Sequence, residues 1–181
     1  LGCALTATGN DVTLEDIARI ADVFYIGGTK VGAMFGEAVV FTHGNMPKNF
    51  VTLVKQHGAL LAKGWLLGVQ FDTLFTDDLY CRIARHANDA ADRIREVLVE
   101  RGYTLTFDAP TNQIFITLDN ATSGRLQRNV RLGFMEKADD THTVMRICKI
   151  LGIKAMSNDA ALYLTDDTER LLTQYAKLDD Y

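Results

Sequence analysis

Lys30 is the residue whose surroundings in the sequence point most directly to chemistry. It follows Gly27 and Gly28, precedes a nearly uncharged apolar run, and has Asp22 and Glu37 as its nearest acidic residues along the chain. An ammonium group among apolar neighbours loses hydration, which favours a neutral amine that attacks carbonyls and forms Schiff bases. A surface hairpin lysine whose amine reaches water explains the same pattern, and on composition alone it is the simpler interpretation.

The residues beside Lys30 have little or no side chain. Gly27, Gly28, Gly32 and Ala33 keep side chains away from the lysine on both sides. Such space is needed where a flat cofactor approaches the backbone. The segment therefore predicts either a cofactor lysine or an exposed hairpin.

Other catalytic signatures are missing from the sequence. There is no G-x-x-x-x-G-K-[ST] phosphate loop, no G-x-G-x-x-G, no H-E-x-x-H and no G-x-S-x-G. The four histidines have no pair at ligand spacing, so no metal site is predicted. The three cysteines are far apart and odd in number, which argues against a disulfide framework and favours the cytoplasm.

Composition excludes two classes of partner. The 181 residues are 48% hydrophobic and 23% charged, as in a globular protein of one domain or slightly more. The net charge is -4 and the basic residues are scattered, so neither nucleic acid nor an anionic membrane is expected as a partner. The first residue is leucine, from which we expect a piece of a longer protein.

The sequence around Lys30 predicts a helix and two strands that position it. Thr13 to Asp16 resembles a capping box, and apolar spacing then predicts a helix over 14–21. Residues 23–26 and 37–41 are β-branched, aromatic and apolar, as in buried strands. Lys30 is expected on the loop between these strands.

The rest of the chain predicts two further helical regions and a smaller α+β domain. A helix over about 49–75 is expected to be bent or split at its glycines, and a regular amphipathic helix is expected from residue 79 to Gly102. Beyond it, alternation predicts strands and then two helical stretches. The expected strands are 103–107, 112–118, 132–136 and 144–147, and the helical stretches are 125–129 and 162–178.

Two long motifs and one weaker one are similar to a known enzyme family. They are D-V-F-Y-I-G-G-T-K-V-G-A-M-F-G-E-A-V-V-F at 22–41 and L-V-K-Q-H-G-A-L-L-A-K-G-W-L-L-G-V-Q-F at 53–71. The weaker match joins T-N-Q-I-F at 111–115 to H-T-V-M-R-I-C at 142–148. Together they resemble the threonine aldolase and β-eliminating lyase family of pyridoxal-phosphate enzymes, in unbroken order from Leu1 to about Cys148.

The resemblance implies a fold and an assembly. It implies an α/β protein of the aspartate-aminotransferase-like class, pyridoxal-phosphate fold type I. Residues 1–98 would end the large cofactor-binding domain with interdomain helices, and residues 99–181 would form the small α+β domain. Relatives are homodimers or homotetramers with active sites at subunit interfaces, so the same is expected here.

The resemblance also assigns roles to single residues. Lys30 would be the catalytic lysine that holds pyridoxal 5'-phosphate, with Thr29 and Gly28 shaping the phosphate end or the loop. Arg146 would grip the substrate α-carboxylate as a bidentate fork. Lys63 and Lys55 match basic positions near the active site, some reached from the neighbouring subunit, and imply a phosphate and a substrate contact. A solvated helix face explains these two lysines nearly as well.

The chain departs from the family at both ends. The family's Asp-Gly-Ala-Arg segment, with the aspartate that pairs with the pyridine nitrogen, would lie just before Leu1, and from Lys149 onward no resemblance remains. Without a negative partner for the ring nitrogen the cofactor is a poor electron sink. We therefore expect the 181 residues alone to bind the cofactor weakly and not to turn over threonine.

The reaction implied for a complete enzyme is cleavage of L-threonine or L-allo-threonine to glycine and acetaldehyde. Two alternatives stay open. Another pyridoxal-phosphate reaction, such as β-elimination, uses the same lysine and arginine, because fold does not fix reaction. The chain is otherwise a truncated remnant that keeps the family's core without catalysis.

Overall fold

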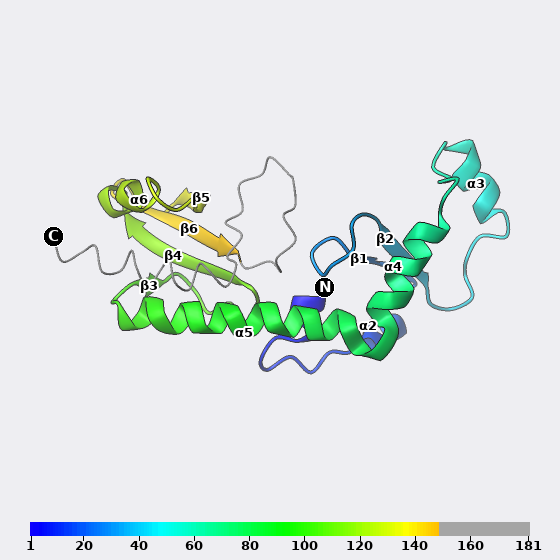
Figure 1. Cartoon of the computed structure of the whole chain (residues 1–181), viewed down its shortest axis with the longest axis horizontal. Coiled ribbons are helices and arrows are strands. Elements are labelled where there is room, and N and C mark those ends of the chain that lie inside the picture. Colours follow the sequence, from blue (N-terminus) through cyan, green and yellow to red (C-terminus); the bar gives the residue numbers. More distant parts are fainter. Residues whose placement is uncertain (149–181) are drawn as a thin grey trace.

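The computed structural model describes residues 1–148, which form two groups of elements joined by one long helix (Figure 1). The first group holds α1 (Gly2–Leu5), α2 (Leu14–Ile20), β1 (Val23–Gly27), β2 (Glu37–Phe41), α3 (Phe50–Gln56) and α4 (Trp65–Phe75). A short 3-10 turn, η1 (Thr76–Asp78), leads into α5 (Leu79–Glu100). The second group holds β3 (Thr104–Leu105), β4 (Gln113–Asp119), α6 (Asn120–Leu126), β5 (Gly133–Lys137) and β6 (His142–Cys148). The helix predicted over 162–178 lies outside the described residues.

The predicted hairpin around Lys30 is confirmed. Thr13 and Asp16 form the capping box that starts α2: the Asp16 N–H donates to the Thr13 hydroxyl, and the Asp16 carboxylate accepts from the Thr13 N–H. These hydrogen bonds hold the pKa of Asp16 below its ordinary value. After α2, strands β1 and β2 pair antiparallel, with Tyr25 opposite Val39.

The first group has a small core beneath one face of the hairpin. Ile26 of β1 packs there with apolar residues from the β1–β2 loop, α4 and the start of α5. The other hairpin face stays apolar and exposed: Val23, Tyr25 and Val39 are 47%, 67% and 55% exposed. The fully buried or nearly buried members of this core are Ile26, Val31, Ala33, Phe71, Leu74, Tyr80 and Ala84.

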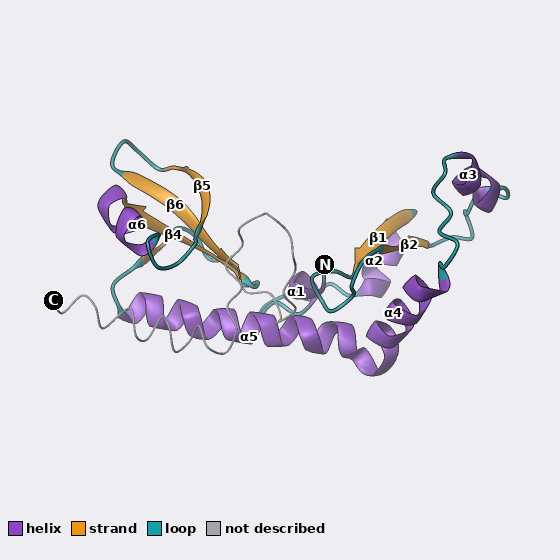
Figure 2. Cartoon of the chain, turned by 45° about the horizontal axis from the view of Figure 1, so that its top comes forward, coloured by secondary structure: helices purple, strands orange, loops and turns teal. Residues whose placement is uncertain are grey.

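The predicted split of the 49–75 helix is also confirmed. Helix α3 ends before Gly58, whose φ of +65° interrupts the helix, and α4 begins after Gly64. No residue of α3 is buried. Figures 1 and 2 both show α3 at the far end of the molecule from the second group, with α4 leading back to α5.

Helix α5 contributes to the cores of both groups. Tyr80 and Ala84 belong to the first core, whereas Ala91, Ile94 and Leu98 belong to the second. This division follows from the amphipathic spacing predicted for the helix, because one apolar face runs along its whole length. The domain boundary placed between residues 98 and 99 stays a prediction.

The second group is a four-stranded antiparallel sheet in the order β3-β4-β6-β5. Ile114, Ile116 and Leu118 alternate along β4 and are at most 3% exposed. Their neighbours in the core are Ala91, Ile94, Leu98, Leu132, Met145 and Ile147. The predicted strands are confirmed within a few residues, although β3 is only two residues long.

Two short helices differ from the prediction. The helix expected over 125–129 is instead α6, which begins at Asn120 because the Asp119 carboxylate accepts a hydrogen bond from the Thr122 N–H at 2.8 Å. Helix α1 was not predicted. It is held by tertiary contacts with α5, where the Asn88 side-chain amide donates to the Cys3 carbonyl at 2.9 Å and to the Thr6 hydroxyl at 3.0 Å.

Candidate functional site

Lys30 lies at the tip of a tight turn between β1 and β2. The Gly28 carbonyl accepts hydrogen bonds from the backbone N–H groups of Val31 and Ala33, both at 3.0 Å. Val31 and Ala33 are buried, and Lys30 is exposed. Because these two buried residues anchor the turn, the exposed lysine just before them lies on its outer side.

The space at Gly28 is used by the protein core. A Cβ at this position would lie 2.7 Å from the Ala33 Cβ and 3.0 Å from Cζ of Phe71. Gly28 therefore allows the turn to pack against α4, and the prediction that its missing side chain leaves room for a flat cofactor is corrected. The open position is Gly27, where an added Cβ would meet nothing within 4 Å.

Gln70 of α4 holds the other end of the Lys30 loop. Its side-chain carbonyl accepts from the Met34 N–H at 2.6 Å, and its amide donates to the Phe35 carbonyl at 3.5 Å. The Tyr80 hydroxyl donates to the Gly27 carbonyl at 3.1 Å on the opposite side. Burial raises the pKa of Tyr80, so its hydroxyl stays a donor. The lysine loop is thus fixed by both α4 and α5.

Arg146 lies on β6, the strand between β4 and β5. It is half-buried and pairs with Phe115 on one side and Gly133 on the other. A Cβ on Gly133 would lie 3.6 Å from Nε of Arg146, at ordinary van der Waals distance, so the arginine side chain lies against β5 at this position. Its neighbours in the strand, Met145 and Ile147, point to the core, and Arg146 therefore shares the opposite face with Cys148.

Lys30 and Arg146 come from different groups, and the positive charges of both act on the Cys148 thiol. Burial raises the pKa of Cys148, while the positive charges of Arg146 and Lys30 both act to lower it. Within residues 1–148, neither cation has a hydrogen bond or an ion pair. Two cations that lack a partner among the described residues, and whose charges act on the same half-buried thiol, are suited to bind an anion such as a carboxylate or a phosphate.

One expectation about the setting of Lys30 was wrong. The sequence predicted a desolvated lysine among apolar residues, but the side chain is exposed, because the turn places Val31 and Ala33 in the core and leaves Lys30 outside. The exposed hairpin of the alternative interpretation is the arrangement observed. What distinguishes Lys30 is that its positive charge, like that of Arg146, acts to lower the pKa of Cys148.

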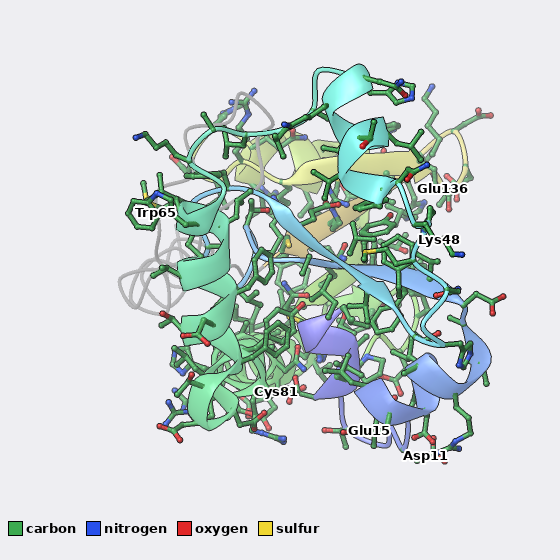
Figure 3. The ribbon with its side chains drawn as sticks, turned by 90° about the vertical axis from the view of Figure 1, so that its right-hand side faces the viewer. Asp11, Glu15, Lys48, Trp65, Cys81 and Glu136 are labelled. Carbon is green, nitrogen blue, oxygen red and sulfur yellow. The ribbon has the colours of Figure 1, made fainter. Side chains whose placement is uncertain are left out.

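Of the remaining predicted site residues, Lys55 and Lys63 are not brought together with this pair. Thr29 is exposed beside Lys30. Lys55 is exposed on α3, and Lys63 is exposed in the segment between α3 and α4. In Figure 3, Trp65 projects from the start of α4 at the edge of the molecule, and it is 64% exposed. The segment formed by α3 and the residues between α3 and α4 therefore places Lys55 and Lys63 away from β6.

Two residues near the site were missed by the sequence reasoning. Cys148 is the thiol on which the charges of both cations act, and the Asn112 side-chain amide donates to its sulfur at 3.9 Å. The alternation of β6 could have placed Cys148 on the same face as Arg146.

Within the described part of the chain, no group of three His, Cys, Asp or Glu side chains could hold a metal ion. No helix there is long and apolar enough to cross a membrane.

Comparison with known proteins identifies several relatives. The chain is 34% identical over 98 residues to a low specificity L-threonine aldolase of Pseudomonas aeruginosa, and 32% identical over 98 residues to the enzyme of the same name from a Pseudomonas species. Each match covers 54% of this chain and 28% of the relative. No protein-family model matches the chain.

A solved structure gives a broader match. The chain superimposes on threonine aldolase of Leishmania major with a TM-score of 0.79 and 34% sequence identity, over 97% of this chain and 49% of that one. The chain therefore spans about half the length of that protein. At this identity and coverage the likeness confirms the predicted fold class, the carboxy-terminal part of an aspartate-aminotransferase-like protein.

Proposed function

Because the chain belongs to the threonine aldolase family, we propose that it forms part of a pyridoxal-phosphate-dependent carbon–carbon lyase. The complete enzyme would cleave L-threonine or L-allo-threonine to glycine and acetaldehyde. One observation carries the proposal: the charges of Lys30 and Arg146, which have no partner among the described residues and come from two different groups of elements, both act on the same thiol. An amine and a guanidinium are the two groups that an amino-acid substrate with a carbonyl cofactor requires.

Three residues of this chain, Lys30, Thr29 and Gly28, fit a role in binding the cofactor. Lys30 has a free amine on a turn fixed by α4 and α5, so it is suited to hold the cofactor's aldehyde carbon covalently. Thr29 and Gly28 would set the loop that carries it. When bound, pyridoxal phosphate supplies the electron sink for breaking the Cα–Cβ bond of the substrate.

Arg146 would hold the substrate by its α-carboxylate. Its guanidinium is half-buried, has no partner among the described residues, and lies on a strand fixed on both sides by β4 and β5. A planar guanidinium binds a carboxylate through two parallel hydrogen bonds, which fixes the orientation of the amino acid. The amino group of the substrate would thereby be directed toward Lys30.

Lys63 and Lys55 fit a role in a second copy of the protein. Both lie on the arm around α3, which has no buried residue and extends away from the Lys30 and Arg146 pair. We propose that they contact cofactor phosphate and substrate in the neighbouring subunit of a homodimer or homotetramer. The cytoplasm is the compartment that fits three free thiols.

The exposed face of the β1–β2 hairpin supports a role as part of a larger enzyme. A two-stranded hairpin is only marginally stable on its own, and here Tyr25 and Val39 form an exposed apolar pair across it. We propose that residues 1–98 complete a large domain whose other elements cover this face. Residues 99–181 would then form the small domain.

The role of Lys30 is tested by visible absorption with added pyridoxal phosphate. We expect a cofactor band that disappears in Lys30→Ala and persists in Lys48→Ala, a variant of an exposed lysine with no interaction in the described residues. A band that survives Lys30→Ala would refute the assignment.

The reaction is tested in the complete protein that contains this chain. Incubation with L-threonine should release glycine and acetaldehyde. Release of pyruvate from serine, cysteine or tyrosine, without acetaldehyde from threonine, would replace the aldolase by a β-eliminating lyase. A protein that binds the cofactor and releases neither product would be a remnant without catalysis.

A further inference from the structure

The turn between α4 and α5 has a backbone conformation that its residues disfavour. Asp77 and Asp78 follow one another with φ of +51° and +56°, and among residues 1–148 no other non-glycine residue has a positive φ. This left-handed region brings Cβ of an L-residue too close to the following carbonyl oxygen, although aspartate tolerates it better than most residues. Two consecutive residues in this region make the turn a strained segment.

The local sequence does not require a break at this turn. From Val69 to Arg101 the chain has neither glycine nor proline, and helical residues flank the turn on both sides. Aspartate is a weak helix former, but it does not exclude a helix as proline does. Figures 1 and 2 nevertheless both show a sharp bend where α4 meets α5. The bend is therefore imposed by packing around the turn.

Aromatic contacts across the turn hold this bend. The rings of Phe75, at the end of α4, and Tyr80, in α5, stack with their centroids 5.3 Å apart and their planes at 16°. In one straight helix, residues five apart lie about 140° apart around the axis, so their rings cannot stack. Phe71 stacks on the other ring of α4 at 6.4 Å, and Tyr80 is buried. The complete stack thus requires the bent arrangement.

The bend also positions the loop that carries Lys30. Gln70 of α4 accepts from the Met34 N–H at 2.6 Å, whereas Tyr80 of α5 donates to the Gly27 carbonyl at 3.1 Å. One end of the loop is thus held from α4 and the other from α5, on opposite sides of the strained turn. Because straightening the turn changes the separation of α4 and α5, it removes one of these two supports.

We propose that residues 76–78 form a strained hinge with two states. In the bent state the aromatic stack offsets the strain, and the Lys30 loop is held by α4 and α5. In the straight state α4 and α5 form one helix, the two aspartates leave the left-handed region, and the loop is released from Gln70. Asp77, Asp78 and Phe75 are therefore positioning residues for Lys30. The proposal does not depend on the proposed function, since both states are defined without cofactor or substrate.

The test measures one distance across the turn in variants of the 181-residue chain. Trp65, the only tryptophan of the sequence, is the fluorescence donor. An acceptor dye is attached at Arg85→Cys, in a chain whose Cys3, Cys81 and Cys148 are replaced by serine. In one continuous helix positions 65 and 85 lie about 30 Å apart, and any bend between them shortens this distance. Time-resolved energy transfer separates the two states.

The first variant removes the tolerance for the left-handed region. Asp77→Ala/Asp78→Ala should gain a second distance near 30 Å, because alanine opposes that region and favours a helix. The Met34 N–H should exchange several-fold faster in this variant, as measured by hydrogen exchange and NMR. The matched variant Asp77→Gly/Asp78→Gly loses the same charges but should keep the shorter distance and the slow exchange, because glycine adopts a positive φ without strain.

A second variant leaves the turn residues unchanged. Phe75 is 41% exposed, so Phe75→Ala removes the stack on Tyr80 and spares the buried core. We expect part of the molecules to show the longer distance here too, with faster exchange of the Met34 N–H.

Three outcomes would overturn the proposal. These are a single short distance in both alanine-containing variants, a glycine variant that lengthens as the double alanine variant does, and a longer distance without faster exchange at Met34. Circular dichroism of each variant separates straightening, which retains the helical signal, from unfolding.

Discussion

The two groups of elements differ in how completely they bury their apolar surface. In the second group, β4 and β6 place alternate residues in a core closed by α5, and Ile114, Ile116 and Met145 are 1% exposed. In the first group, the β1–β2 hairpin covers its core with one face and leaves Tyr25 and Val39 exposed on the other. The core of the second group is thus covered by α5 and the sheet, although Phe107, Phe134 and Met135 remain exposed, whereas in the first group a whole hairpin face is open to further packing.

The candidate site draws one cation from each group. Lys30 lies on the open group and Arg146 on the closed one, and the charges of both act on Cys148. The position of each cation depends on its own group, and their separation depends on the junction. Substitutions in the two groups should therefore have effects of different size and kind.

The largest effect is expected in the closed group. Ile116→Ala removes a fully buried side chain from the sheet and should lower the free energy of unfolding by about 3 kcal/mol. Val39→Ala on the exposed hairpin face should change it by less than about 0.5 kcal/mol. Urea unfolding followed by circular dichroism measures both. Equal losses would contradict the difference between the groups.

A smaller effect is expected at the turn beneath Lys30. Gly28→Ala places a Cβ 2.7 Å from the Ala33 Cβ and should lower the free energy of unfolding by about 1–3 kcal/mol. Adding Ala33→Gly removes the opposing carbon, so the double variant should regain part of the loss. Strictly additive losses in urea unfolding would mean that this contact is not the cause.

The link between α5 and the start of β4 should contribute less. The Arg95 guanidinium, with 12% of its side chain exposed, donates to the Thr111 carbonyl at 3.0 and 3.1 Å. Arg95→Met should lower the free energy of unfolding by about 1–2 kcal/mol, because the carbonyl loses a charged donor. Arg82→Met, at an exposed position of the same helix, serves as the control and should be near neutral.

The smallest effect is expected at the junction of the two groups and is measured as the alkylation rate of Cys148. The positive charge of Lys30 lowers the pKa of Cys148, so Lys30→Ala should raise that pKa and leave less thiolate at pH 8. Alkylation of Cys148 by iodoacetamide should therefore slow, as followed by mass spectrometry of its peptide. Lys48→Ala should leave the alkylation rate unchanged. If both variants slow alkylation equally, the charge of Lys30 does not act specifically on Cys148.

Local patterns in the sequence predict most elements of the described fold. The capping box at Thr13, the split near Gly58 and the amphipathic face of α5 each depend on neighbours in the chain. Helix α1 could not be predicted in this way, because its four residues are held by Asn88, far away in sequence. The early start of α6 was missed because the capping role of Asp119 was not recognised.

The sequence predicted which residues belong to the candidate site, but not how exposed they are or what packs around them. Lys30 and Arg146 were assigned from motifs that resemble a family, but the exposure of Lys30 depends on how Val31 and Ala33 pack below it. The space at Gly28 likewise depends on Phe71, which lies on another helix. The effect of both charges on Cys148 depends on how the two groups pack, and no local sequence pattern indicates it.

The central claim is that Lys30 is the amine that holds the cofactor opposite Arg146. The most direct measurement is borohydride reduction of the chain with pyridoxal phosphate, followed by peptide mapping of the lysines that carry the label. The account predicts labelling concentrated on Lys30, with much less on the exposed Lys48, Lys55 and Lys63. Labelling spread evenly over these four lysines would contradict it.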